Sequence, residues 1–242
     1  MIIEFKKYVD NYDKRSRAIK RKYKHSLRVM QLAKKYATLL NYSEEDIELA
    51  TLIGLLHDIG RFDQSKLYHT FDDSKSFDHA EYGVKILFEN NLIDIFRKEK
   101  KNDDIIKFAI SNHNKLVIAT HKTERELLHA KLIRDVDKID ILYQAGELHE
   151  IKIMATKEKI NLKVLENIKK HKPVLKKDAL NKNDRIALLF SFAFDINNSI
   201  CLEEVKSNII ALYERIKDKY ERLKPVYEEV IKYLDNRINV NK

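Results

Sequence analysis

The chemistry of this chain centres on a histidine and an aspartate that stand side by side at the end of an apolar run. His57 and Asp58 follow the segment Leu49–Leu56, in which Thr51 is the one polar side chain. A helix this apolar is expected to be central and buried. Burying a carboxylate beside an imidazole is unfavourable unless a cation or a charge partner compensates them. The pair therefore predicts a compensating positive charge inside the protein.

Two further side chains of the same chemical types lie on apolar helix faces. His25 is in line with Val29 and Leu32 at helical spacing, and Asp137 is in register with Ile133. One such histidine alone is more often a hydrogen-bonded core residue. Together with the adjacent His-Asp pair, however, these groups favour a bound divalent cation, because imidazole and carboxylate are common ligands of transition metals.

These residues, in the order His25, His57-Asp58 and Asp137, resemble the H…HD…D signature of the HD-domain metal-dependent phosphohydrolases. The segment 55–62, LLHDIGRF, is very similar to the form of the motif that begins HDIG. Other stretches that resemble bacterial members of this superfamily are 78–83, 112–115 and 134–142. The resemblance spans roughly residues 20–143, and the C-terminal hundred residues resemble no family.

The resemblance implies that His25, His57, Asp58 and Asp137 hold a first metal ion. In subfamilies with two additional histidines, these bind a second metal, bridged to the first by the aspartate of the HD pair. The residues at those two positions here are His79 and His113. Some two-metal members carry adjacent histidines at the later position, where this chain has Asn112-His113-Asn114, so one or two metals per chain remain open. The donor set suits Fe, Mn, Zn, Co or Ni.

Positive side chains near such a site indicate a phosphorylated substrate. Arg61 directly follows the HDIG turn, and we assign it, with Asp58, to catalysis. Arg61, Lys115 and Lys138 are the candidate substrate-binding residues, with structural salt bridges as the alternative for each. The expected activity is hydrolysis of a phosphate ester, as a phosphatase or phosphodiesterase acting on a nucleotide or related phosphorylated metabolite through a metal-bound hydroxide.

Three other functions stay open. One is a nucleotide-sensing regulatory module that keeps the metal but has little turnover, and another is a di-iron oxygenase of the same superfamily. The third is nucleic-acid binding, because the net charge is +9 and the basic residues concentrate in 1–24 and 151–186. No nucleic-acid-binding motif accompanies those lysines, so solvated helix faces are the simpler explanation and nucleic acid is not an expected partner.

The periodicity predicts an all-α fold, an HD-domain-like helical bundle with additional C-terminal helices. We expect one domain over residues 1–242, with the metal-binding core at about 20–143 and a helical extension at about 144–242. Ser43 and Asp78 are predicted caps, Pro173 a break and Pro225 a kink or helix start. The segment 61–77 reads as a loop. Another helix is expected directly after Asp78. The other expected helices are at about 17–41, 44–60, 104–113, 124–143, 145–155, 159–171, 183–197, 202–218 and 219–238.

Composition excludes several classes of protein. Four glycines and two prolines are too few for a collagen-like or turn-rich β structure. Cys201 stands alone, which excludes an intramolecular disulfide and an all-thiolate zinc site. No apolar run approaches the roughly 20 residues of a membrane helix, so we expect a cytoplasmic protein without a membrane partner. The helices near 202–238 could pack internally or form a homodimer. The remaining histidines are assigned to surface, core or helix-end roles: His69, His121, His129, His149 and His171.

Overall fold

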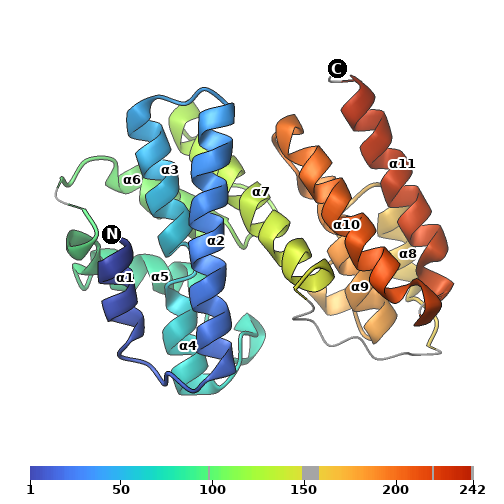
Figure 1. The fold of residues 1–242 in the computed structure, drawn as a ribbon, viewed down its shortest axis with the longest axis horizontal. Helices are drawn as coiled ribbons and strands as arrows, with labels where there is room; N and C mark the ends of the chain where they lie inside the picture. The colour runs from blue at the N-terminus through green and yellow to red at the C-terminus, as the bar shows by residue number, and fades with distance from the viewer. Residues whose placement is uncertain (98, 149–157, 220, 241–242) are drawn as a thin grey trace. The chain divides into compact units, whose positions relative to one another are not determined.

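The protein is described by a computed structural model, which covers residues 1–97, 99–148, 158–219 and 221–240. Throughout these ranges the regular structure is helical, without a strand, so the predicted all-α fold is confirmed (Figure 1). The chain separates into two compact units, residues 1–136 and 137–242. The prediction of one domain is not tested by this division, because compactness does not say whether either unit folds alone.

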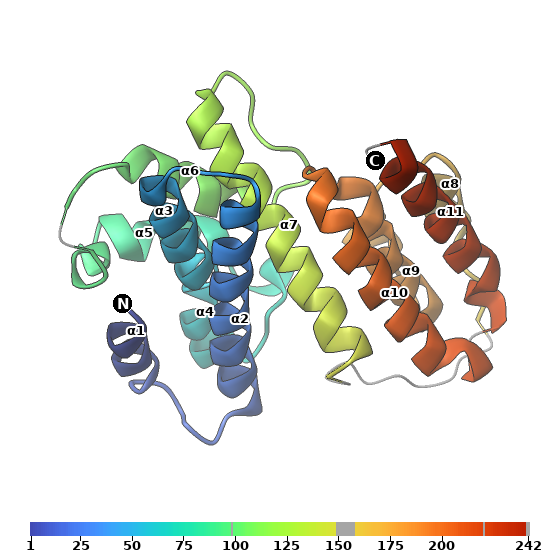
Figure 2. The ribbon, with the colours of Figure 1, turned by 45° about the horizontal axis from the view of Figure 1, so that its top comes forward.

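The first unit holds the helices around the HD pair. They are α1 (Ile2–Val9), α2 (Arg17–Leu39), α3 (Glu44–Leu56), α4 (Gly60–Tyr68), α5 (His79–Phe88), α6 (Asp103–Asn112) and the first part of α7 (Glu124–Gly146), with short 3₁₀ turns η1 (Asp73–Lys75) and η2 (Leu92–Ile95). Helices α2 and α3 lie side by side in both ribbon views (Figures 1 and 2). Ser43 caps α3 by accepting a hydrogen bond from the Asp46 backbone at 3.2 Å, and Asp78 caps α5, as predicted.

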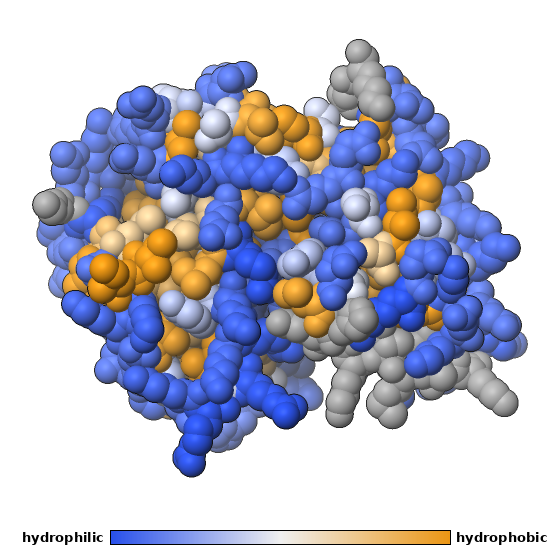
Figure 3. Space-filling view, viewed as in Figure 1, coloured by the Kyte–Doolittle hydropathy of each residue, from blue (hydrophilic) through white to orange (hydrophobic). Residues whose placement is uncertain are grey.

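Two predictions at the start of this unit were wrong or incomplete. Residues 60–68 form helix α4, although 61–77 reads as a loop in the sequence. The reason is that α4 buries polar residues, Arg61 and Gln64 among them, so its inner face carries no clear apolar stripe. Helix α1 was not predicted; Phe5 and Val9 anchor it in the core, while Ile2 and Ile3 remain about half and two-thirds exposed. Figure 3 shows apolar surface on its left, the side of the first unit on which Figure 1 draws α1.

The second unit consists of the last part of α7 and four further helices. These are α8 (Leu162–Lys169), α9 (Lys182–Phe190), α10 (Leu202–Ile216) and α11 (Lys224–Val240), with 3₁₀ turns η3 (Lys176–Asp178), η4 (Ser191–Asp195), η5 (Ser199–Cys201), η6 (Lys217–Lys219) and η7 (Glu221–Leu223). The end of α7 packs on α10, where the Asn208 amide donates to the Ile139 carbonyl at 3.2 Å. Pro225 is the second residue of α11, so it marks a helix start. Most of the helix predicted at 145–155 lies outside the described residues.

No helix in the described ranges combines the length and the apolar character needed to cross a membrane.

Glycines allow the closest contacts of the first unit. A Cβ on Gly54 would lie 2.9 Å from Ala33 Cβ, so α2 and α3 can approach only with glycine there. A Cβ on Gly60 would lie 2.3 Å from the His79 carbonyl oxygen, which is an impossible contact. The first residues of α4 and α5 therefore touch through their backbones. By contrast, a Cβ on Gly83 would meet Ile59 at an ordinary 3.4 Å.

This contact makes Gly60 a sensitive position. We expect Gly60→Ala to lower the free energy of unfolding by about 1–3 kcal/mol, because a backbone carbonyl must move to admit the methyl group. Gly83→Ala is the control, and it should be neutral or slightly stabilising because alanine favours helix. Urea unfolding followed by circular dichroism measures both. Equal stability of the two variants would contradict the packing described here.

Candidate metal centre

Five of the six predicted metal ligands belong to the first unit, and each is at least 94% buried. His25 comes from the middle of α2, the one ligand of the five that is not near a helix end. The others stand where helices begin or end: His57 directly after α3, Asp58 in the turn before α4, His79 at the first position of α5 and His113 directly after α6. Helix termini, rather than helix faces, therefore assemble most of the candidate site.

The Asp58 carboxylate lies between two pairs of histidines. Its Oδ2 atom is 3.2 Å from His25 Nε2 and 3.5 Å from His57 Nε2. Its Oδ1 atom is 3.2 Å from His79 Nε2 and 3.7 Å from His113 Nε2. Each oxygen thus faces one imidazole pair, so the carboxylate offers one oxygen atom to each pair.

The histidine tautomers are fixed from outside the cluster. His57 Nδ1 donates to the Gly54 carbonyl at 2.8 Å, and His113 Nδ1 donates to the Ile110 carbonyl at 2.6 Å. His79 Nδ1 donates to Asp73 Oδ2 at 2.7 Å. With the proton on Nδ1, the neutral ring presents a bare Nε2 lone pair. In the neutral form, all three rings therefore direct the Nε2 lone pair toward Asp58.

The distances within each pair fit a shared cation. His25 Nε2 and His57 Nε2 are 3.2 Å apart, and His79 Nε2 and His113 Nε2 are 3.0 Å apart. Ligands about 2.1 Å from one metal ion are about 3.0 Å apart at neighbouring octahedral corners and about 3.4 Å apart at tetrahedral corners. Buried lone pairs that converge at this spacing are costly unless a cation lies between them. The donors present therefore fit a divalent transition metal in each group.

The charges around Asp58 keep it ionised. Burial alone would raise the pKa of its carboxyl group, but the Lys22 ammonium beside it more than offsets burial and holds that pKa well below its usual range. Burial lowers the pKa of His113 to about 4, so its ring stays neutral at physiological pH. A carboxylate and a neutral imidazole are the forms that bind metal ions.

Arg61 is brought to the cluster, but it is held there by protein groups. Its Nε lies 3.5 Å from Asp58 Oδ1, and its Nη1 donates to Asp73 Oδ1 at 2.7 Å. The same Nη1 donates to Gln64 Oε1 and to the Phe71 carbonyl, both at 2.6 Å. These contacts match the structural alternative considered for Arg61. Its predicted contact with substrate stays a prediction.

A second group of contacts brings His79 and His113 together. Asp78, the cap of α5, accepts hydrogen bonds from Asn114 Nδ2 at 2.9 Å and from Lys115 Nζ at 2.6 Å. These two hydrogen bonds connect Asp78, directly before His79, with Asn114 and Lys115, directly after His113. Lys115 therefore has a structural partner, and its predicted role in substrate binding is untested.

Two predicted residues belong to the second unit. Asp137 is its first residue, directly after Val136 on the continuous helix α7, and its place among the ligands stays a prediction. The Lys138 ammonium pairs with Asp195 Oδ2 at 2.9 Å within the same unit. Substrate binding by Lys138 likewise stays a prediction.

The remaining histidines are placed in varied surroundings. His129 is buried and its Nε2 donates to Asp46 Oδ1 at 2.9 Å, and His171 pairs with Glu229 at 2.8 Å. His69 and His121 are exposed and adopt left-handed backbone conformations. His149 lies outside the described residues.

Sequence reasoning missed two residues of the site. Lys22, which pairs with Asp58 Oδ2, stands three residues before His25 on α2, and this spacing places both side chains on one helix face. Asp73 lies in η1, inside the segment taken for a loop, and receives hydrogen bonds from His79, Arg61 and Gln64. The position of Lys22 could have been inferred from helical spacing, whereas nothing in the local pattern pointed to Asp73.

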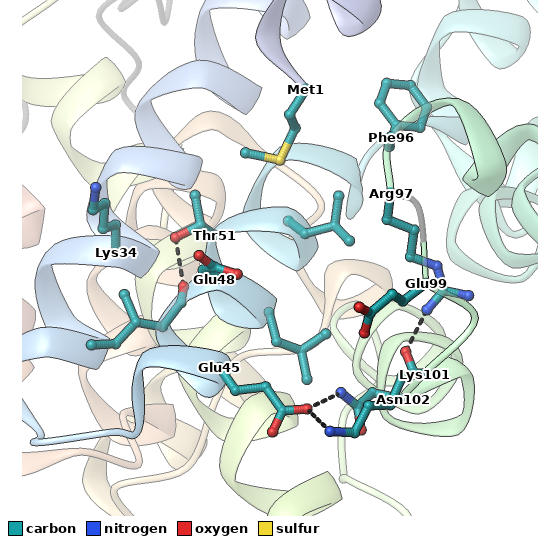
Figure 4. Close-up of a pocket in the computed structure, with 13 residues that line it drawn as sticks. Met1, Lys34, Glu45, Glu48, Thr51, Phe96, Arg97, Glu99, Lys101 and Asn102 are labelled. Carbon is teal, nitrogen blue, oxygen red and sulfur yellow. Dashed lines mark hydrogen bonds and ion pairs between the residues drawn. The ribbon is translucent and has the colours of Figure 1, made fainter.

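A cavity of about 560 Å³ in the first unit lies apart from this cluster, and none of the predicted ligands lines it. One of its acidic lining residues, Glu45, accepts a hydrogen bond from Asn102 Nδ2 at 2.8 Å and pairs with Lys101 Nζ at 3.0 Å (Figure 4). The cavity therefore adds no group to the chemistry of the histidine cluster.

Asp73 offers a test of how His79 is held. We expect Asp73→Asn to weaken metal binding at the His79–His113 pair about 10- to 100-fold, because an amide no longer favours the proton on His79 Nδ1. Asp72→Asn, in the same turn, is the control and should leave the affinity unchanged. Isothermal titration with Mn²⁺ measures both. Unaltered affinity in Asp73→Asn would show that this hydrogen bond does not set the tautomer.

Comparison with known families agrees with this geometry. The family model described as HD domain matches residues 23–143, half of the chain. Comparisons with the curated proteins and with the solved structures gave no match. HD domains are typically metal-dependent hydrolases, and the buried His/Asp groups found here could bind a metal. On the match and on the residues that carry it, the chain belongs to the HD-domain family.

Proposed function

We propose that this protein is a metal-dependent phosphohydrolase that acts on a phosphate ester, with a nucleotide or a related phosphorylated metabolite as substrate. One observation carries the proposal: the two oxygens of a buried aspartate each face a pair of histidine nitrogens at 3.2–3.7 Å. Two-metal centres of this kind stabilise both the attacking and the leaving oxygen of a phosphoryl transfer.

Each residue of the cluster has a part in this proposal. His25 and His57 would hold one metal ion with Asp58 Oδ2, and His79 and His113 would hold a second with Oδ1. Asp137 is proposed as a further ligand of the first ion. When bound, divalent metals supply Lewis acidity, which lowers the pKa of water toward neutrality and offsets charge on phosphoryl oxygens. Arg61 keeps the bridging carboxylate in place through its 3.5 Å contact with Asp58.

The burial of the cluster strengthens the electrostatic interactions on which the proposed hydrolysis depends. The five ligands of the first unit are all nearly inaccessible, so electrostatic interactions within the cluster are only weakly screened by water. The nucleotide-sensing module and the di-iron oxygenase would use the same ligands. Metal identity and turnover, rather than the ligand set, distinguish these alternatives.

The decisive experiment is metal-dependent phosphate release. We expect chelated protein to be inactive and protein loaded with Mn, Ni, Co, Zn or Fe to hydrolyse esters in a panel of nucleotides and p-nitrophenyl phosphates. Asp58→Asn should lose activity by about 10³-fold or more, because it removes the shared ligand. His69→Asn, at an exposed position that tolerates asparagine, is the control and should keep full activity. Full activity in Asp58→Asn would falsify the proposal.

A separate measurement counts the metal ions. Wild-type protein should hold about two per chain after equal loading, and His79→Ala about one, because only the Oδ1 pair is broken. Asp137→Asn should reduce the occupancy of the first metal site, which His25 and His57 form with Asp58 Oδ2, if Asp137 is a further ligand of that site. Elemental analysis after gel filtration gives the ratios. Equal metal content in wild type and His79→Ala would refute the second metal site.

A further inference from the structure

The Lys22 ammonium competes for the oxygen that would bind the first metal ion. Lys22 Nζ pairs with Asp58 Oδ2, and the same oxygen lies 3.2 Å from His25 Nε2 and 3.5 Å from His57 Nε2. The Lys22 side chain is mostly buried, with 16% of its surface exposed. In the part of the chain that the structure describes, Asp58 is its ion-pair partner. A divalent cation at this oxygen would repel the ammonium at close range.

Three positively charged side chains lie around the ring of Phe71, beside the contact of Lys22 with Asp58. Lys22 Nζ lies 5.6 Å from the ring centroid, Arg21 Cζ 5.7 Å and Arg61 Cζ 5.9 Å. Phe71 lies in the segment between α4 and η1, and its carbonyl oxygen accepts the hydrogen bond from Arg61. Three cations around one ring, beside the histidine cluster, create a local site that favours an anion.

The three cations differ in their freedom to bind a ligand. Arg61 is fixed by hydrogen bonds to Gln64, Asp73 and the Phe71 carbonyl, all through Nη1. Arg21 is exposed. Lys22 has a flexible stem with three rotatable donors, so its ammonium can leave Asp58 while its stem stays against the ring.

We propose that Lys22 is a shared ammonium: it releases Asp58 when a divalent cation binds there, and it then binds a phosphoryl oxygen of the substrate beside Phe71. Arg21 completes this anion subsite from the exposed side of the ring. The ligand class is a phosphate dianion, as in a phosphomonoester or a terminal phosphate. This inference rests on the proposed function, because the divalent cation that displaces Lys22 from Asp58 is the first metal ion of that proposal.

The test separates metal binding from phosphate binding by calorimetry. Lys22→Met should bind Mn²⁺ about 10-fold more tightly than wild type, because a competing charge is gone, and should bind inorganic phosphate about 10-fold more weakly once loaded with metal. Lys24→Met is the matched control, two residues along α2 and exposed, and both affinities should equal those of wild type. Arg21→Met should weaken phosphate binding about 2- to 5-fold without changing Mn²⁺ affinity.

The outcomes distinguish this inference from the proposed function. Unchanged phosphate affinity in Lys22→Met, or a loss of Mn²⁺ affinity alongside phosphate affinity, would overturn the role of Lys22. If Lys22→Met does not fold, Arg21→Met decides, and unchanged phosphate affinity there overturns the subsite. Wild-type protein that binds Mn²⁺ and phosphate but hydrolyses no ester contradicts the proposed function alone. Wild-type protein that binds no metal contradicts both.

Discussion

The structure of the first unit depends on how one buried carboxylate is compensated. Asp58 is 3% exposed, and it remains charged because the Lys22 ammonium pairs with it and Arg61 Nε lies 3.5 Å from its Oδ1. Taking such a group out of water costs free energy that only close partners can offset. Lys22 belongs to α2 and Arg61 to α4, so these two helices supply the positive charges within about 4 Å of the carboxylate.

The ends of the helices fix the orientation of three histidine rings. The last turn of a helix offers backbone carbonyls, and two histidines that follow helices use them: His57 bonds to Gly54 and His113 to Ile110. These bonds are local, three residues back along the chain. His79 begins a helix instead, where no such carbonyl is at hand, and a separate carboxylate, Asp73, takes its proton. The need for Asp73 is thus a consequence of where His79 stands in its helix.

Sequence reasoning reached the parts of this arrangement that depend on local rules. The apolar run before His57, the helical spacing around His25 and the caps Ser43 and Asp78 each follow from periodicity or hydrogen-bonding preference. The helix at 60–68 could not be predicted from such rules, because its buried face is polar. Arg61 and Gln64 on that face donate hydrogen bonds to Asp73 in the following turn. Contacts between residues distant in sequence, such as the pair of Lys22 with Asp58, needed coordinates.

The anchoring of the three Nδ1 protons limits what the histidines can do in a reaction. His57, His79 and His113 each hold that proton against a fixed acceptor and direct the opposite nitrogen at Asp58. A ring used in this way is a ligand and has no proton to pass to a departing alcohol. In the proposed hydrolysis these three rings leave the departing alcohol unprotonated, so it departs as an anion or takes a proton from solvent or from another group such as Lys22. Turnover should accordingly rise with the acidity of the leaving alcohol, and aryl esters should outpace alkyl esters of the same phosphate.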